Sequence, residues 1–337
     1  MAQPYIGGQA VLEGVMMRAP GCITVAVRRP DGTIALREGP YQSRWSRKLW
    51  KLPAFRGVAM LVESLTMGFS ALQFSAEQQM TEEELVEQQG ATRWAMAFSV
   101  VLALGLFIAL PQWLASLSKS AFGWEMGLTD ASFQLLIGFF KLLIFIAYLL
   151  LISRMPDIRR VFQYHGAEHK TINAFERDLP LTVDNVRNQT TMHPRCGTTF
   201  LVVVIVVSII LGSIAAPLLM PDVEGWPGQL LLLVIRIALL PLIAAVSYEF
   251  QRFTARYCTT GWRRFVLFPG FLFQKITTRE PDDDQIEIAI AAMEAAAWRE
   301  EAQDSAPHGD EPLVFETFAR FREALSGDDS LAAARLG

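Results

Sequence analysis

The chain has 337 residues, of which 52% are apolar and only 19% are charged, and its mean hydropathy is positive. Soluble domains carry about 25% charged residues, so this composition excludes an ordinary soluble enzyme or a disordered chain and indicates a membrane protein. The net charge of −4 is small, and we expect no nucleic-acid partner; the three cysteines show no C-x-x-C spacing and predict no disulfide framework.

Residues 1–53 are predicted to form an N-terminal cytoplasmic segment with a β-hairpin. Within "ITVAVRRPDGTIALREG", two β-rich runs flank Pro30, Asp31 and Gly32. Proline presets φ and glycine accepts positive φ, so this tripeptide predicts a turn between two strands.

Residues 54–92 are predicted to form an amphipathic helical segment. Between 54 and 76 apolar residues recur at helical spacing, with Arg56 and Glu63 interspersed. This segment is too polar to be counted as a membrane span, so we expect a helix in the membrane interface or against the bundle. The apolar positions are Val58, Leu61, Val62, Leu65, Phe69 and Leu72.

Four apolar segments within residues 93–256 predict a membrane core. The first is "WAMAFSVVLALGLFIALPQWLASL", and the others run over about 131–153, 198–220 and 229–248. About 20 helical residues cross a hydrocarbon core of roughly 30 Å. We therefore predict a mainly α fold, a four-span transmembrane helical bundle with a small cytoplasmic β-hairpin region and cytoplasmic amphipathic helices.

The basic residues predict the orientation. The short connections near 117–130 and 221–227 together hold one lysine and no arginine, whereas the loop 154–197 holds seven basic residues. An excess of arginine and lysine marks the cytoplasmic side. We predict a multi-pass protein of the cytoplasmic (inner) membrane with both termini in the cytoplasm and the lipid bilayer as its surroundings.

Two segments follow the membrane core. Residues 257–299 predict a cytoplasmic helical segment, because "PDDDQIEIAIAAMEAAAW" begins with aspartates that can cap a helix and continues in strong helix formers. Residues 300–337 are acidic and predict a disordered tail.

The stretch "YHGAEHK" carries the strongest chemical signal in the chain. Pro156 predicts a helix start, and on that helix His165 and His169 project from one face at i and i+4, with Glu168 nearly on the same side. The string is H-x-x-E-H, in which two histidines hold zinc and the glutamate activates water. The alternative is two solvated or packed histidines, with Glu168 paired to a neighbouring basic side chain.

A catalytic zinc needs a third protein ligand and an open position. His193, before the third span, and Glu249, at the end of the fourth, are both predicted to reach the same membrane face. A different set, His165, His169, His193 and Cys196, would form a closed structural site. Cys196 is otherwise a small buried residue.

Four long strings resemble those of the YqhQ-like bacterial membrane proteins, a domain-of-unknown-function family described as predicted metal-dependent enzymes. They are "GGQAVLEGVMMRAP" (7–20), "YHGAEHKTINAFE" (164–176), "HPRCGTTF" (193–200) and "TTREPDDDQIEIAIAAM" (277–293), and the resemblance extends from residue 5 to about 297. It implies a membrane protein with a metal site and gives neither substrate nor reaction.

The first of these strings contains two further reactive side chains. Glu13 is a candidate second acid at the site, and Arg18 is a candidate clamp for a carboxylate or phosphate. The preferred interpretation is structural, a strand and turn leading into the hairpin, in which Gly7 and Gly8 permit a tight turn or a close backbone approach.

Lys141 and Arg236 lie inside the second and fourth predicted spans, and no acidic residue of the apolar spans neutralises them. Charges within a membrane are functional candidates, here for an anion or lipid site. The alternative is that both side chains reach the outer surface.

The preferred hypothesis is a zinc-dependent hydrolase, peptidase-like, at the cytoplasmic face, with a membrane protein or peptide as substrate. Glu168 is the predicted base, and His165 and His169 with Glu249 or His193 are the predicted ligands. Zinc is the expected cofactor, with another divalent metal as an alternative. The competing hypotheses are a non-enzymatic assembly factor with a structural metal and an anion or lipid transporter.

Overall fold

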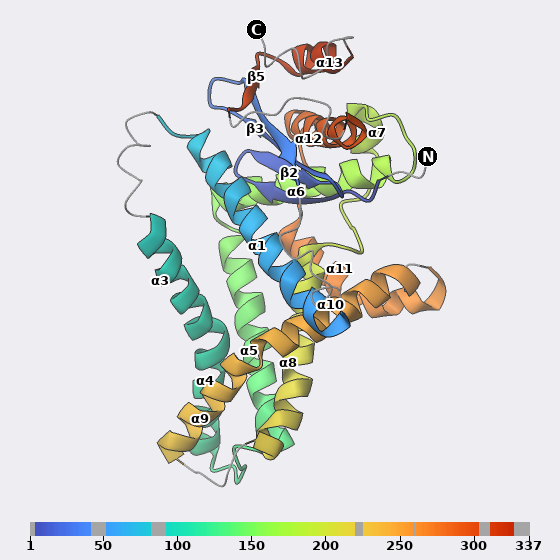
Figure 1. Ribbon diagram of the computed structural model, residues 1–337. Coiled ribbons are helices and arrows are strands. Elements are labelled where there is room, and N and C mark those ends of the chain that lie inside the picture. The colour runs from blue at the N-terminus through green and yellow to red at the C-terminus, as the bar shows by residue number, and fades with distance from the viewer. Residues whose placement is uncertain are drawn as a thin grey trace.

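The computed structural model describes residues 4–41, 52–81, 92–219, 225–258, 260–302 and 311–326. Figure 1 shows a head, built from a small sheet and the helices packed on it, above a bundle of long helices. The fold is mostly helical, as predicted, and it contains one antiparallel sheet within the described residues.

The sheet is a five-stranded antiparallel meander in the order β1-β2-β3-β4-β5. Its third and fourth strands are the predicted hairpin: Arg28 pairs with Ile34 across a turn in which Gly32 has a φ of 88°. Two of the other strands lie in the string 7–20, for which a strand and turn were predicted, and the fifth lies in the tail that was expected to be disordered. The strands are β1 (Gly7–Val11), β2 (Gly14–Arg18), β3 (Cys22–Arg28), β4 (Ile34–Pro40) and β5 (Leu313–Phe315).

Helices cover both faces of the sheet. The helices α6 (Pro156–Phe175) and α12 (Asp283–Ala302) pack on one face, and α1 (Pro53–Glu77) packs on the other through Ala71 and Phe74. The predicted aspartate cap is present at the start of α12, where Asp282 Oδ1 accepts a hydrogen bond from the backbone N–H of Gln285 at 2.9 Å. Most residues of α12 between 286 and 296 are fully buried. The alanines and isoleucines of this stretch allow that burial, because they are apolar and most of them are small.

The prediction of a disordered tail is wrong for residues 311–326. This stretch adds β5 to the sheet and continues into α13 (Phe318–Ser326). Leu313, Phe315 and Phe321 are buried against the head, and this apolar burial offsets the entropic cost of ordering the segment. Residues 300–302 of the predicted tail belong to α12, and residues 303–310 and 327–337 lie outside the described residues.

The bundle contains the first three predicted spans. The first is α3 (Thr92–Leu104), a π-helical turn η2 (Gly105–Ala109) and α4 (Leu110–Phe122), the second is α5 (Ala131–Ile152), and the third is α8 (Gly197–Leu219). Each is long and apolar enough to cross a membrane, at most 28% of its apolar window is buried inside the protein, and several large apolar side chains, such as Leu143 and Ile210, are exposed. Outward-facing apolar side chains are what a lipid environment requires.

The fourth predicted span, over 229–248, is a bent pair of helices that together are long and apolar enough to cross a membrane. The chain forms α9 (Gly225–Ala238) and α10 (Leu240–Tyr257), which meet at 45°. Pro241 lies in the first turn of α10, and because proline has no N–H and crowds the preceding turn, the helix breaks there.

Helix α1 is the fourth helix that is long and apolar enough to cross a membrane, although it was predicted as an interfacial helix. Its predicted apolar stripe, including Leu65 and Phe69, is exposed rather than packed on the bundle. The contacts are made instead by small residues: a Cβ added to Gly57 would lie 2.8 Å from the Cα of Ala245 in α10. Close approach therefore decides which side of α1 is buried.

Candidate metal centre

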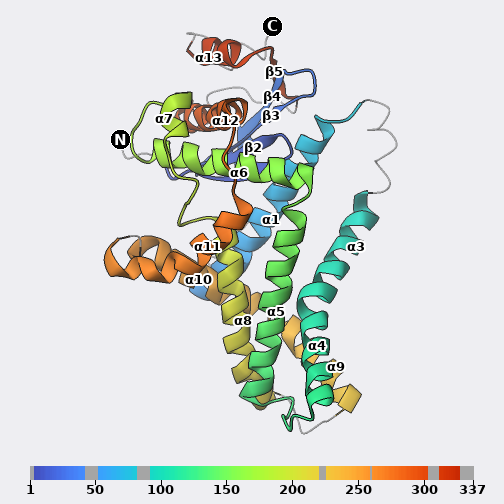
Figure 2. The ribbon, with the colours of Figure 1, turned by 180° about the vertical axis from the view of Figure 1, so that it is seen from behind.

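The two histidines of the H-x-x-E-H string lie where the head meets the bundle. Figure 2 shows α6 running across the top of α5, α8 and α11 (Phe268–Thr277). Gly166 allows this arrangement, because a Cβ at that position would lie only 2.0 Å from the backbone oxygen of Arg279. The same backbone donates a hydrogen bond from the N–H of Arg279 to the oxygen of Phe162 at 2.9 Å, so α6 and the segment after α11 are in direct contact.

Three side chains bring potential metal ligands together. One ligand atom each from His165, His169 and Cys196 lies within 4.8 Å of the others. The centroids of the His165 and His169 rings are 4.4 Å apart, and His165 Nε2 lies 3.2 Å from the sulfur of Cys196. Cys196 precedes the first residue of α8, so the group joins α6 to the start of the third predicted span.

Backbone carbonyls fix the tautomer of both histidines. His165 Nδ1 lies 2.8 Å from the oxygen of Thr277, and His169 Nδ1 lies 2.5 Å from the oxygen of Thr191. A carbonyl only accepts hydrogen bonds, so each Nδ1 carries the proton and each Nε2 presents a lone pair. Metal-binding histidines in proteins are oriented in this way.

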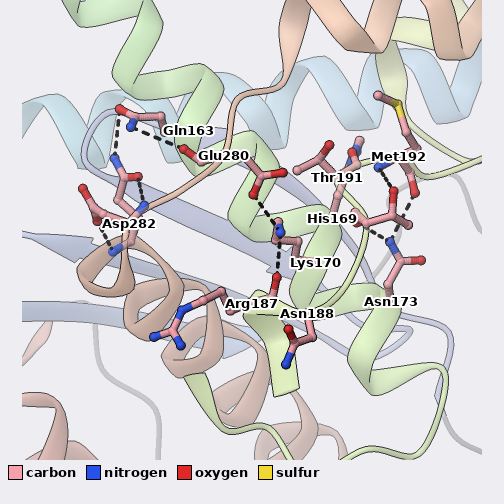
Figure 3. Close-up of polar contacts among 12 residues, drawn as sticks. Gln163, His169, Lys170, Asn173, Arg187, Asn188, Thr191, Met192, Glu280 and Asp282 are labelled. Carbon is pink, nitrogen blue, oxygen red and sulfur yellow. Dashed lines mark hydrogen bonds and ion pairs between the residues drawn. The ribbon is translucent and has the colours of Figure 1, made fainter. Parts of the chain in front are cut away.

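The segment that carries the oxygen of Thr191 is itself held in place, as Figure 3 shows. Lys170 Nζ donates to the oxygen of Arg187 at 2.8 Å and pairs with Glu280 at 2.8 Å. Asn173 Nδ2 donates to the oxygens of residues 190 and 192. Helix α6 therefore supplies both the histidines and the side chains that position their supporting loop.

Burial favours the neutral form of His169 and His193, which is the form that can bind a metal ion. It lowers the pKa of His169 and of His193 below the usual value for imidazole, so both rings are neutral at neutral pH. Within the described chain, His169 Nε2 is buried and makes no hydrogen bond. A buried, unpaired nitrogen is unfavourable unless something binds it, which fits a metal ion.

Glu168 lies in the same buried region. Burial raises the pKa of its carboxyl group, while the neighbouring His165 and His193 act in the opposite direction. Its Oε2 has no hydrogen-bond partner among the residues that the structure describes. The strand β1 passes so close that a Cβ on Gly8 would lie 2.7 Å from Glu168 Cγ, which is the close backbone approach that was one of the two expectations for this glycine; a Cβ on Gly7 would meet nothing within 4 Å.

The two proposed third ligands occupy other positions. His193 is buried beside the group, with its ring 5.7 Å from that of His169 and its Nε2 3.5 Å from a carboxylate oxygen of Glu176. Glu249 forms a two-pronged ion pair with Arg56 of α1. Cys196, the alternative ligand of the sequence analysis, is the residue that lies with the two histidines.

The remaining candidates serve other contacts. Glu13 lies in the turn between β1 and β2 with a φ of 49° and pairs with Arg160 of α6, and Arg18 donates a hydrogen bond to Tyr41. The contacts of Lys141 and Arg236 lie within the bundle. The supporting carbonyls of residues 191 and 277 could not be predicted, because backbone groups leave no signal in the residue types.

A histidine pair and a thiolate suit zinc, and three ligands leave a fourth position open. The residues present therefore fit the metal that the sequence predicts. The site is small, mostly buried and partly open on the side of His165.

Comparisons with known proteins assign a family without a function. Residues 52–299 match the family described as "Protein of unknown function (DUF1385)". A protein of Bacillus subtilis (strain 168) described as "Uncharacterized protein YqhQ" is 34% identical over 304 residues, which cover 86% of this chain and 91% of the relative. No solved structure matches the chain.

Proposed function

The chain belongs to the DUF1385 family of proteins of unknown function, and we propose that it is a membrane-embedded, zinc-dependent hydrolase. The proposed ligands are His165, His169 and Cys196, and Glu168 is the proposed base. The observation that carries the proposal is the fixed tautomer of both histidines, which directs two imidazole lone pairs towards one thiol.

A zinc ion with an open coordination position would supply a Lewis acid that polarises a substrate carbonyl and activates a water molecule. Glu168 is suited to receive a proton there, because its carboxylate is buried next to the two ligand histidines in the chain. Burial raises the pKa of the Glu168 carboxyl group towards neutral pH, and a group whose pKa lies near the working pH accepts and returns a proton more effectively. Glu168 would then pass this proton to the leaving group.

The proposed substrate is a peptide or membrane protein. The H-x-x-E-H scheme favours peptide bonds. The site lies at the junction of the head and the apolar helices, which suits a substrate segment held at the membrane surface. We further propose that this surface is the cytoplasmic one, on the basis of the basic residues in the loop 154–197.

Metal content tests the proposal first. We expect about one zinc per chain in protein purified in detergent without chelator, and loss of the zinc in His165→Ala and Cys196→Ser. In cobalt-substituted protein the sulfur-to-cobalt charge-transfer band should be absent from Cys196→Ser. Cys258→Ser is the matched control, since Cys258 is also buried but lies outside the group. Absence of metal from the wild type would refute the proposal.

Glu168→Gln separates a catalytic metal from a structural one. The isosteric amide cannot act as a base, so hydrolysis of peptide or membrane-protein substrates should fall by at least about 100-fold while the zinc content is unchanged. The alternative function is an assembly factor with a structural metal. It would be favoured if the Glu168→Gln protein fully complements the phenotype of a gene deletion and the His165→Ala protein does not. The burial of the sulfur of Cys196 is the observation that favours this alternative.

A further inference from the structure

The bundle contains a second polar site, formed by residues of α5, α8 and α9. The guanidinium group of Arg236 in α9 is only 9% exposed and donates from Nη2 to Oε1 of Gln134 in α5. Its Nε is buried and has no partner in the part of the chain that the structure describes. Arginine has five donor hydrogens, so one neutral amide oxygen leaves most of them unused.

Lys141 adds a second positive charge to this site. Its Nζ donates to Oγ of Ser208 at 2.9 Å, which links α5 to α8. Lys141 follows Gln134 by seven residues in α5, so the two side chains lie on the same face of the helix, roughly 10 Å apart along its axis. Segments 131–153, 197–219 and 225–248 of the sequence contain no aspartate or glutamate.

Two neighbouring cations with neutral partners are costly in an apolar bundle. Hydrogen bonds from glutamine and serine satisfy individual donors but leave the net charge uncompensated, and burial of such a charge is unfavourable unless an opposite charge is present. Arg236 does not avoid this cost by reaching water, because its side chain is more than nine-tenths buried. An anion would supply both the missing charge and the missing acceptors.

The position of the site indicates which anion would reach it. Gln134 lies in the first turn of α5, roughly 5 Å along the axis from the start of the helix. A membrane headgroup can reach that depth. A surface groove of about 580 Å³ opens at the same end of the helix. Its lining is mainly apolar, from Trp124, Met126, Leu135, Leu136 and Phe139, and also includes Ser132 and the acidic Glu125.

We propose that Arg236 and Lys141 form the cationic side of a binding site for a phosphate group, supplied by an anionic phospholipid or by free phosphate. Arg236 presents paired N–H groups to the phosphate oxygens, and Lys141 contributes a point charge. The neighbouring groove provides apolar surface for an acyl chain. The proposal does not depend on the metal or on the hydrolase activity.

Thermal unfolding of the delipidated full chain in a neutral detergent tests the site. The probes are phosphatidylglycerol, phosphatidylcholine and inorganic phosphate, and we expect phosphatidylglycerol to raise the unfolding midpoint by about 4 °C. An equal rise with inorganic phosphate would assign the site to a free anion. An equal rise with phosphatidylcholine would overturn the proposal, because that headgroup has no net charge.

The double variant Arg236→Gln/Lys141→Gln should lose the shift. Without lipid its midpoint should not fall, because the substitutions remove uncompensated charge. Lys119→Gln is the control, since Lys119 is a cation at the end of α4 without a described bond to this site. If the double variant fails to fold, Arg236→Lys should retain part of the shift, and an unchanged phosphatidylglycerol response in Lys141→Gln would then overturn the proposal.

Discussion

The substitution Gly166→Ala should weaken metal binding without touching a metal ligand. The new Cβ would lie 2.0 Å from the backbone oxygen of Arg279, and real Cβ atoms essentially never come closer than 3.0 Å to such atoms. The segment must therefore move by at least about 1 Å. Two residues earlier, the oxygen of Thr277 accepts the bond from His165 Nδ1 at 2.8 Å. The same movement would lengthen this bond to about 3.8 Å, which is beyond hydrogen-bonding range.

Loss of such a supporting hydrogen bond typically costs 10- to 100-fold in metal affinity, and the overpacking costs about 1–3 kcal/mol of stability. Competition with a chromophoric chelator measures the affinity in detergent, and thermal unfolding measures the stability. Gly197→Ala is the matched control, because Gly197 adjoins Cys196 but its added Cβ would meet nothing within 4 Å. A folded Gly166→Ala protein with wild-type affinity would refute the supporting role of Thr277.

Two further results are expected around the centre. The new Cβ in Gly8→Ala would push on the side chain of Glu168, so the rate of hydrolysis should fall by up to about 100-fold while the zinc content stays unchanged. Gly7→Ala is the control and should leave the rate unaltered, because a Cβ there would meet nothing within 4 Å. Equal rates in the two variants would contradict this prediction. Burial raises the pKa of Cys22 to about 12, so in peptide mass spectrometry Cys22 should resist iodoacetamide at about pH 8, while Cys196 should become alkylated once a chelator has removed the metal. Rapid alkylation of Cys22 in the folded protein would show that its thiol is accessible and ionised.

The sequence predicted those parts of the fold that depend on local patterns. Apolar runs of more than 20 residues identify α5 and α8, because length and hydropathy are properties of one segment. The same holds for the turn at Gly32 and for the pairing of His165 with His169, since both depend on spacing within a few residues.

The remainder of the fold depends on contacts between distant segments. The apolar side chains of α1 did not show which side of the helix packs on the protein, because Gly57 and Ala71 allow close packing that a hydropathy pattern does not record. The strand at Leu313 to Phe315 lies in an acidic tail and pairs with β4, at residues 277 to 281 positions earlier in the chain. Neither arrangement can be inferred from the residues of one segment.

The grouping of metal ligands shows the same limit at the candidate site. The sequence analysis preferred His193 or Glu249 as the third ligand and kept Cys196 as an alternative, because spacing along the chain does not show which side chain lies beside the histidines. The difference comes from Arg56, which lies on α1 and forms an ion pair with Glu249. Choosing the ligand therefore required knowing how α1 packs against α10, a contact between segments about 190 residues apart.

The candidate centre joins three parts of the chain that also pack against one another. His165 and His169 belong to the head through α6, Cys196 begins a helix of the bundle, and Thr277 ends α11. A metal bound by these side chains would fix the head relative to the bundle, since metal binding that exists only in the folded state adds to stability. Removal of the metal should then lower the unfolding midpoint of the wild type and leave that of His165→Ala unchanged, whether the ion is catalytic or structural. Only the response to Glu168→Gln distinguishes these two roles, because Glu168 contributes no ligand to the three-residue group.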